Sequence, residues 1–282
     1  MLALLIVPTI AFQEIVWAPS PQIARAYAQK TGKPLMLVSR RLDPGRNFLD
    51  RCFDDSRVIE LSRKFVCYRA NSPTELSQFG KLPSNLVKVE MMPPPVIFVE
   101  PSGRFISRMG AFYWPSAFAE YLRQALWVRS SSAAIQKELS KERPEGKYLA
   151  QWAVVKAVQC ELKSAELYCE RAIARGAPER ELAAALQAIA DAYRAEGQFK
   201  ESLVPLRRSL TYADSPADVF KARIRLGSSY LRLGDIEKAE AEALRCIRMD
   251  GIRAEDREIA EFQLDRLKFM KPLPEKRKLE ER

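Results

Sequence analysis

The amino-acid sequence predicts an α/β sandwich followed by an all-α region of helical repeats. Over residues 20–127, helix-like stretches alternate with short apolar stretches of strand length. Over residues 148–270 the pattern is helical, and small and large apolar residues recur at a constant spacing of 37 residues. The chain has 282 residues, of which 47% are hydrophobic and 29% charged, so it can build two modest folded domains.

The first region divides into eight predicted elements. In order, they are a helix at 22–30, a strand at 35–39, a helix at 47–64, a strand at 65–70, a helix at 74–80, strands at 96–100 and 104–108, and a helix at 115–127. Gly32 and Pro34 end the first helix, and the turn Pro101-Ser102-Gly103 joins the last two strands as a hairpin. This order predicts an α/β sandwich around a mixed sheet.

Four local motifs in this region resemble the thioredoxin-like fold. They are Trp17 with Gly32-Lys33-Pro34 ahead of the first strand, Phe53-Asp54-Asp55-Ser56-Arg57-Val58, Pro94 ahead of the strand and turn at 96–103, and Gly110. The resemblance covers residues 14–127 and implies the same α/β sandwich.

The resemblance also implies where an active site would lie and that its chemistry is lost. The family's W-C-G-P-C aligns with Arg41-Leu42-Asp43-Pro44-Gly45, so Leu42 and Gly45 stand at the two cysteine positions. Thiol–disulfide exchange needs both sulfurs. The family's cis-proline aligns with Pro94, and Pro93 before it has no N–H for a peptide substrate. We therefore expect no catalytic residue and no cofactor at this corner.

Four arginines surround the degenerate corner: Arg40, Arg41, Arg46 and Arg51. One interpretation is a docking spot for carboxylate or phosphate groups beside a helix N-terminus. The other is four solvated side chains on a basic domain.

The second region contains a repeat that aligns Ala153 with Ala190 and Gly227. The same offset relates Trp152, Ile189 and Leu226, as well as Leu162, Phe199 and Ile236, and Ala165, Ser202 and Ala239. This pattern resembles the tetratricopeptide (TPR) repeat, with a degenerate first copy. We expect three helical hairpins over 148–250 and a capping helix at 253–270.

The TPR resemblance implies a groove lined by the first helix of each hairpin. The expected lining residues are Ala150, Val154, Ala157, Val158, Gln187, Asp191, Arg194, Lys221, Ile224, Ser228 and Arg232. A peptide with an acidic end and an apolar body would suit this lining, with Arg194, Lys221 and Arg232 contacting its carboxylates. The alternative is that the apolar end packs on the first domain and the charges are solvated.

Composition excludes several classes of function. Histidine is absent, which excludes catalytic triads and metal sites that depend on imidazole. The net charge is +10, but the charges of the second half alternate in sign and no nucleic-acid motif occurs, so we expect no nucleic-acid partner. The five cysteines show no C-x-x-C spacing, and we expect no metal site.

Three further segments complete the predicted organisation. Residues 1–12 are apolar and resemble the core of a secretory signal, although an ordinary first strand is the other interpretation. They are too short to span a bilayer. Residues 128–147 form an expected linker with a short helix at 133–139, and residues 271–282 a charged tail. We expect export to the periplasm or cell envelope, or a cytoplasmic protein if 1–12 is not a signal.

The sequence thus predicts a non-catalytic interaction or scaffold protein. In this hypothesis a redox-inactive thioredoxin-like domain is joined to a TPR array that binds a protein or peptide, preferably an acidic one. The alternative is an enzyme, namely a thiol-dependent oxidoreductase or chaperone-like protein that uses one cysteine, Cys52 or Cys67.

Overall fold

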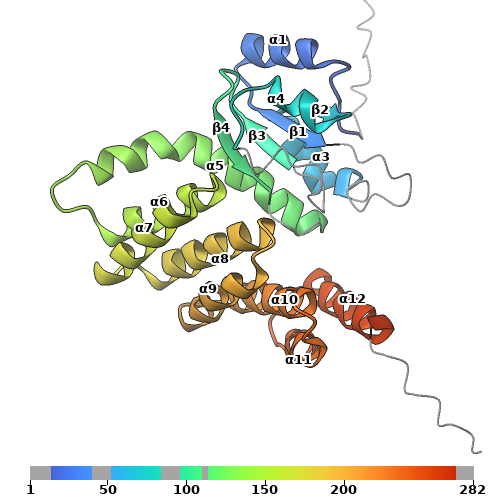
Figure 1. The fold of residues 1–282 in the computed structure, drawn as a ribbon, viewed down its shortest axis with the longest axis vertical. Helices are drawn as coiled ribbons and strands as arrows, with labels where there is room; N and C mark the ends of the chain where they lie inside the picture. Colours follow the sequence, from blue (N-terminus) through green and yellow to red (C-terminus); the bar gives the residue numbers. More distant parts are fainter. Residues whose placement is uncertain (1–13, 40–51, 84–95, 110–113, 271–282) are drawn as a thin grey trace, which may run out of the picture. The chain divides into compact units, whose positions relative to one another are not determined.

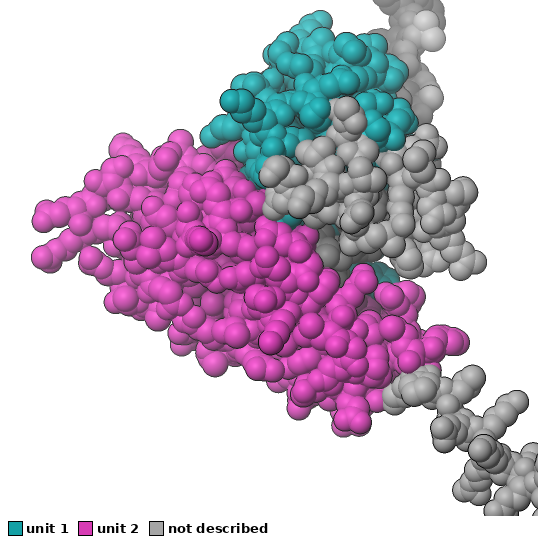
Figure 2. Space-filling view, in the orientation of Figure 1, with its two compact units in different colours: residues 1–127 teal, residues 128–282 magenta. Residues whose placement is uncertain are grey.

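The computed structural model describes residues 14–39, 52–83, 96–109 and 114–270. The chain divides into two compact units, residues 1–127 and residues 128–282, which Figure 2 colours teal and magenta. The expected signal segment at 1–12 and the expected tail at 271–282 lie outside the described residues.

The first unit is built on a small mixed sheet of four strands (Figure 1), as the sequence predicts. The strands are β1 (Leu35–Ser39), β2 (Val66–Ala70), β3 (Val96–Val99) and β4 (Phe105–Arg108), in the spatial order β2-β1-β3-β4. β1 pairs in parallel with β2 and antiparallel with β3, and β3 and β4 form the predicted hairpin. Every residue of β1 and β3 is buried, so both faces of the central strands are covered.

α1 (Pro21–Thr31) begins and ends within one residue of its predicted bounds, whereas α4 (Pro73–Ser77) begins within one residue of its predicted start but ends three residues earlier than predicted. In α1 the Ser20 hydroxyl accepts a hydrogen bond from the Ile23 N–H, and Gly32 ends the helix with a φ of 66°. In α4 the Ser72 hydroxyl caps the N-terminus by accepting from the Glu75 N–H.

The prediction of one continuous helix over 47–64 is wrong in its described part, because the helical conformation is interrupted at residues 54–55, just before α3 (Ser56–Ser62). Asp55 has extended backbone angles, and its carboxylate accepts from the N–H groups of Arg57 and Val58 at 2.9 and 3.4 Å. Asp55 thus starts a new helix as its N-cap. Cys52 and Ile59 are both buried.

The join between the two regions also differs from the expectation. α5 runs without interruption from Pro115 to Leu139, so the helix predicted at 115–127 and the short one at 133–139 belong to one element. Three serines in a row did not break it, because serine is only a weak helix breaker. The Ser132 hydroxyl donates to the Val128 carbonyl oxygen, 2.5 Å away, so it finds a partner within the helix.

The second unit continues as seven packed helices. They are α6 (Gly146–Val158), α7 (Leu162–Ala174), α8 (Glu179–Ala195), α9 (Phe199–Thr211), α10 (Pro216–Arg232), α11 (Ile236–Ile247) and α12 (Ala254–Met270). α7, α9 and α11 begin 37 residues apart, as do α8 and α10, in agreement with the predicted spacing. The chain therefore forms the three expected hairpins and one further helix.

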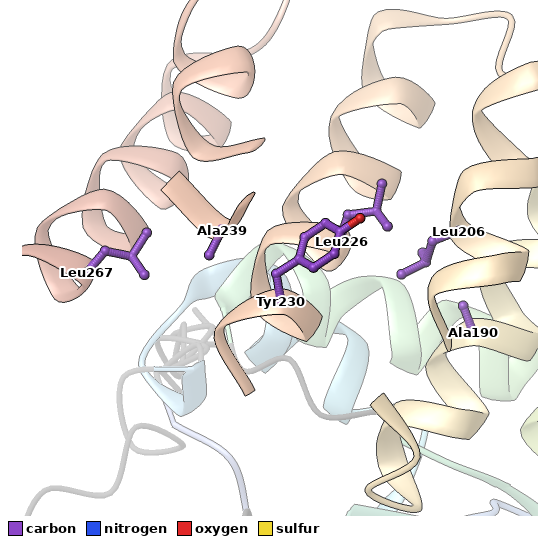
Figure 3. Close-up of a cluster of buried hydrophobic side chains, with 6 residues drawn as sticks. All are labelled: Ala190, Leu206, Leu226, Tyr230, Ala239 and Leu267. Atoms are coloured by element: carbon purple, nitrogen blue, oxygen red, sulfur yellow. The ribbon is translucent and has the colours of Figure 1, made fainter. Parts of the chain in front are cut away.

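Small and large residues from successive hairpins build a shared core in this unit. Figure 3 shows Leu226 and Tyr230 of α10 between Leu206 on one side and Ala239 and Leu267 on the other. Ala239 has no exposed surface, and its small side chain lets the helices approach closely. Within the described part of the chain, no helix is both long and apolar enough to cross a bilayer.

Candidate binding surface on helices α8 and α10

The predicted corner in the first unit lies outside the described residues. This holds for Leu42, Gly45 and Pro94, and for the four arginines Arg40, Arg41, Arg46 and Arg51. Of this part of the first unit, the structure describes β1, which precedes the corner in the sequence, and β3, which follows Pro94.

One cation near this end of the sheet was missed by the sequence reasoning. Arg69 pairs in register with Val38 near the carboxyl ends of the parallel strands β1 and β2. Its guanidinium carbon lies 4.3 Å from the centroid of the Trp17 ring and 4.9 Å from that of Phe53. The two rings themselves pack edge to face at 5.1 Å. Stacking on two aromatic rings holds this positive charge in place.

The two cysteines considered as nucleophiles are both buried. Cys52 is fully buried and Cys67, inside β2, is 3% exposed. Burial raises the pKa of each thiol to about 12, and Asp55 adds to the effect at Cys52. A thiol with such a pKa holds almost no thiolate near neutral pH, so neither sulfur is poised for attack.

The structure brings together four of the six charged and polar residues predicted to line a groove. Gln187, Asp191 and Arg194 follow one face of α8, and Ser228 faces them from α10. The fifth, Lys221, joins the network through its backbone carbonyl, which accepts from Arg225. The sixth, Arg232, is separate and exposed, with its guanidinium carbon 5.9 Å from the Phe199 ring centroid.

A network of hydrogen bonds joins the two helices, and its centre is the Asp191 carboxylate. Asp191 Oδ1 accepts from Arg194 at 3.0 Å and from Arg225 of α10 at 2.8 Å. Arg194 also donates to the Ser228 hydroxyl at 3.1 Å. Arg225 donates to the Lys221 carbonyl at 3.2 Å, and the Gln187 amide donates to the Asp218 carbonyl at 3.2 Å.

Two opposing effects act on the pKa of Asp191. Burial raises the pKa, but the guanidinium groups of Arg225 and Arg194 outweigh it and hold the pKa below its ordinary value. The carboxylate therefore stays ionised near neutral pH, and arginine does not lose its proton there. The network can orient donors and hold two helices in register, but it has no group ready to transfer a proton.

Several lining residues are less accessible than a groove would require. Arg194 is 2% exposed and already paired with Asp191, so its expected contact with a ligand carboxylate is not supported. In the first hairpin, all four expected apolar residues are buried: Ala150, Val154, Ala157 and Val158. Ile224 is also buried, whereas Lys221, Ser228 and Arg232 keep exposed surface.

Arg225 is the residue of the network that the sequence analysis did not select. It lies four residues after Lys221 and three before Ser228, so the helical spacing on α10 could have indicated it. Among the described residues, no group of three or more Cys, Asp or Glu is arranged to hold a metal ion.

Comparison with known proteins identifies no relative for this chain. No protein-family model, curated protein or solved structure matches it.

Proposed function

We propose that this chain is a non-catalytic interaction or scaffold protein. It combines a thioredoxin-like unit that lacks both redox cysteines with a TPR-type helical array, and the array binds a protein or peptide segment. The observation that carries the proposal is the repeated parallel placement of α8 and α10, with polar side chains between them and exposed ones beside them.

The thioredoxin-like part of the proposal is supported by element order and sheet type. The described elements follow the order helix, strand, helix, strand, helix, strand, strand, helix, and the four strands form one mixed sheet. Trp17 forms an isolated parallel bridge with Cys67, which ties the segment before α1 to β2. Leu42 and Gly45, at the two cysteine positions of the motif, carry no sulfur.

The TPR-type part is supported by the 37-residue spacing and by the side chains that occupy it. Gly197 and Gly234 end α8 and α10 with φ values of 78° and 79°, so the same turn recurs in both hairpins. The buried network holds α8 and α10 in register, and Lys221 and Ser228 of α10 keep exposed surface beside it. Helices that are held in place lose little conformational entropy when a ligand binds.

The thiol-enzyme alternative is weaker because both of its sulfurs are buried with a raised pKa. Its nucleophile would have to become exposed and ionised before reaction.

Affinity capture with the whole chain tests the proposal. Immobilised protein would be incubated with extracts of the cell envelope and of the cytoplasm, which also tests the expected export. We expect a specific acidic partner to be retained by the wild type and lost with Lys221→Glu, because Lys221 is the predicted cation of α10 that keeps exposed surface at this face. Equal retention by both proteins would contradict binding at this face.

A further inference from the structure

Exposed apolar side chains gather at the carboxyl ends of α10 and α12. Leu233, which follows α10, is 45% exposed, while Phe269 and Met270 at the end of α12 are 90% and 52% exposed. Exposed apolar side chains that gather in one place, unlike scattered ones, often mark an interaction site. We call these three residues the end patch.

Contacts at three levels show that α10 and α12 run side by side in the same direction. Near their starts, a Cβ built on Gly251 would lie 3.4 Å from Pro216 Cγ. In the middle, Gln263 Nε2 lies 2.8 Å from the Cβ position of Gly227. Toward their ends, Leu267 shares a buried cluster with Tyr230 (Figure 3).

These contacts join α10 to residues 35, 36 and 37 positions later, so the 37-residue offset of the earlier hairpins continues into α12 to within two residues. Buried residues follow the offset, since Ala222, Leu226 and Tyr230 correspond to Ile259, Gln263 and Leu267. By the same offset, Arg232 corresponds to Phe269 and Leu233 to Met270. The members of the end patch therefore lie on adjacent helix ends.

Two exposed arginines precede the members of the end patch in the sequence, and neither has a carboxylate partner among the described residues. Arg232 directly precedes Leu233, with its guanidinium carbon 5.9 Å from the Phe199 ring centroid, and Arg266 lies one turn before Phe269 and Met270. Two carboxylates close to them in sequence are paired elsewhere, Asp265 with Lys268 at 2.7 Å and Asp235 with Lys238 at 2.5 Å. A cation in the last turn suits the helix dipole, but that does not account for the apolar side chains beside it.

We propose that the end patch anchors the bound segment of the partner. An apolar side chain of that segment packs against Leu233, Phe269 and Met270, and its flanking Asp or Glu residues meet Arg232 and Arg266. The inference rests on the proposed function. The apolar part of the bound segment then contacts the last helices of the array and not the first hairpin, where Ala150, Val154, Ala157 and Val158 are buried.

Fluorescence anisotropy with the whole chain tests this anchor. The probe is a labelled acidic peptide with a central Leu-Phe pair, and its controls replace either the acidic residues by Lys or the Leu-Phe pair by Ser-Ser. The double variant Phe269→Ser with Met270→Ser removes the apolar contact, and Arg232→Glu reverses one charge. Val204→Ser is the matched control, because Val204 is 59% exposed on α9.

We expect the acidic Leu-Phe peptide to bind about tenfold more tightly than either control peptide. The double variant and Arg232→Glu should each weaken that binding by about tenfold, and Val204→Ser should leave it unchanged. Equal binding of the Lys control peptide would overturn the charge complementarity.

Two further outcomes would overturn the inference in distinguishable ways. If Lys221→Glu weakens peptide binding while the double variant does not, the proposed function stands but its anchor lies elsewhere. If no peptide binds, and sedimentation shows a dimer that Phe269→Ser disrupts, the end patch joins two copies of the chain instead.

Discussion

At the scale of single residues, Cys160 has a backbone conformation that its side chain disfavours. It follows α6 with a φ of 67°, and it is the only non-glycine residue with a positive φ in the described part of the chain. It stands 37 residues before Gly197, which in turn stands 37 before Gly234. The first hairpin therefore makes the same turn as the others without the glycine that the turn favours.

We predict that Cys160→Gly stabilises the protein. Removing the Cβ relieves the left-handed strain, which is worth about 1 kcal/mol, part of which is offset by greater freedom of the unfolded chain. Chemical denaturation should show a higher free energy of unfolding. The reverse change Gly234→Ala is the control, and it should be destabilising. A Cys160→Gly variant less stable than the wild type would mean that its sulfur makes a contact that outweighs the strain.

Asp191 stabilises the folded state, because its carboxylate neutralises two arginines that are largely buried. Replacing it by Asn leaves Arg194 and Arg225 without their shared carboxylate, and breaking such a buried pair costs about 3 kcal/mol or more. We expect Asp191→Asn to lower the melting temperature clearly. Asp265→Asn is the control, since that carboxylate is 62% exposed in its pair and should matter little. Similar losses in the two variants would contradict a central role for the network.

The same carboxylate predicts how stability depends on pH. The folded-state pKa of Asp191 is lowered, so its contribution is fully present above the unfolded-state value of about 4. That contribution is lost as the pH falls from about 4 through the folded-state pKa. The difference in stability between wild type and Asp191→Asn should therefore shrink below about pH 4, in a series of denaturation curves. A difference that is constant down to the acid limit would show that the carboxylate is not specifically stabilised.

At the scale of secondary-structure elements, the contact between α10 and α12 contains one mismatched side chain. Gln263 stands where the offset places Leu226 in α10 and Ile189 in α8, yet it is a polar residue. Both polar atoms of its amide are buried, and neither has a hydrogen-bond partner in the described structure. A buried amide without partners costs free energy, so α12 packs less favourably than the helices before it.

We predict that Gln263→Met raises the free energy of unfolding by about 1 kcal/mol, because it keeps the length of the side chain and removes the unpaired amide.

A double-mutant cycle with Gly227 tests the contact between Gln263 and α10. In the wild type, Gly227→Ala should stabilise less than helix propensity predicts, since the Gln263 side chain must move away from a Cβ that would lie 2.8 Å from its Nε2. With Gln263→Ala present, the same change should be better tolerated, because alanine favours a helix over glycine by about 1 kcal/mol. Strict additivity of the two changes would exclude a direct contact.

At the scale of the whole molecule, the proposed function requires that no thiol in either unit is catalytic. In the first unit Cys52 and Cys67 have pKa values of about 12, and in the second unit burial raises the pKa of Cys169 to about 11 and of Cys246 to about 12. Cys160 is the one cysteine that keeps partial exposure. In the folded chain, Cys160 is therefore the cysteine whose thiol is accessible to reagents, and it lies in the strained turn after α6.

We predict no catalysis of insulin reduction by dithiothreitol above the rate with the reagent alone. In thiol titration of the native protein near neutral pH, we expect Cys160 to react and the other four cysteines to react only after denaturation. Cys160→Ser is the control, and it should abolish the fast phase. Insulin reduction that is lost in Cys52→Ser would revive the thiol-enzyme alternative.

The sequence by itself determined the strands and most helices in their order, but it joined two helices at 47–64 and divided α5 into two. The strands at 35–39 and 96–100 and the hairpin turn at 101–103 are encoded locally, by apolar runs bounded by Gly and Pro. The three helical hairpins follow from a 37-residue period, which needs no knowledge of neighbours in space. Even the break before α3 had a local signal, because an Asp three residues ahead of buried apolar positions is a typical N-cap.

Only the tertiary structure decided which polar residues of the helical unit are accessible. The TPR resemblance placed Arg194 and Arg232 in the same groove lining, but Arg194 is buried against Asp191 and Ser228 while Arg232 is exposed. The tertiary structure also identified Arg225 as a second partner of Asp191 and packed Leu267 of α12 into the same buried cluster as Tyr230 of α10. The physical reason is that periodicity specifies the direction of a side chain around its own helix, whereas burial and charge pairing depend on what the neighbouring helix places opposite it.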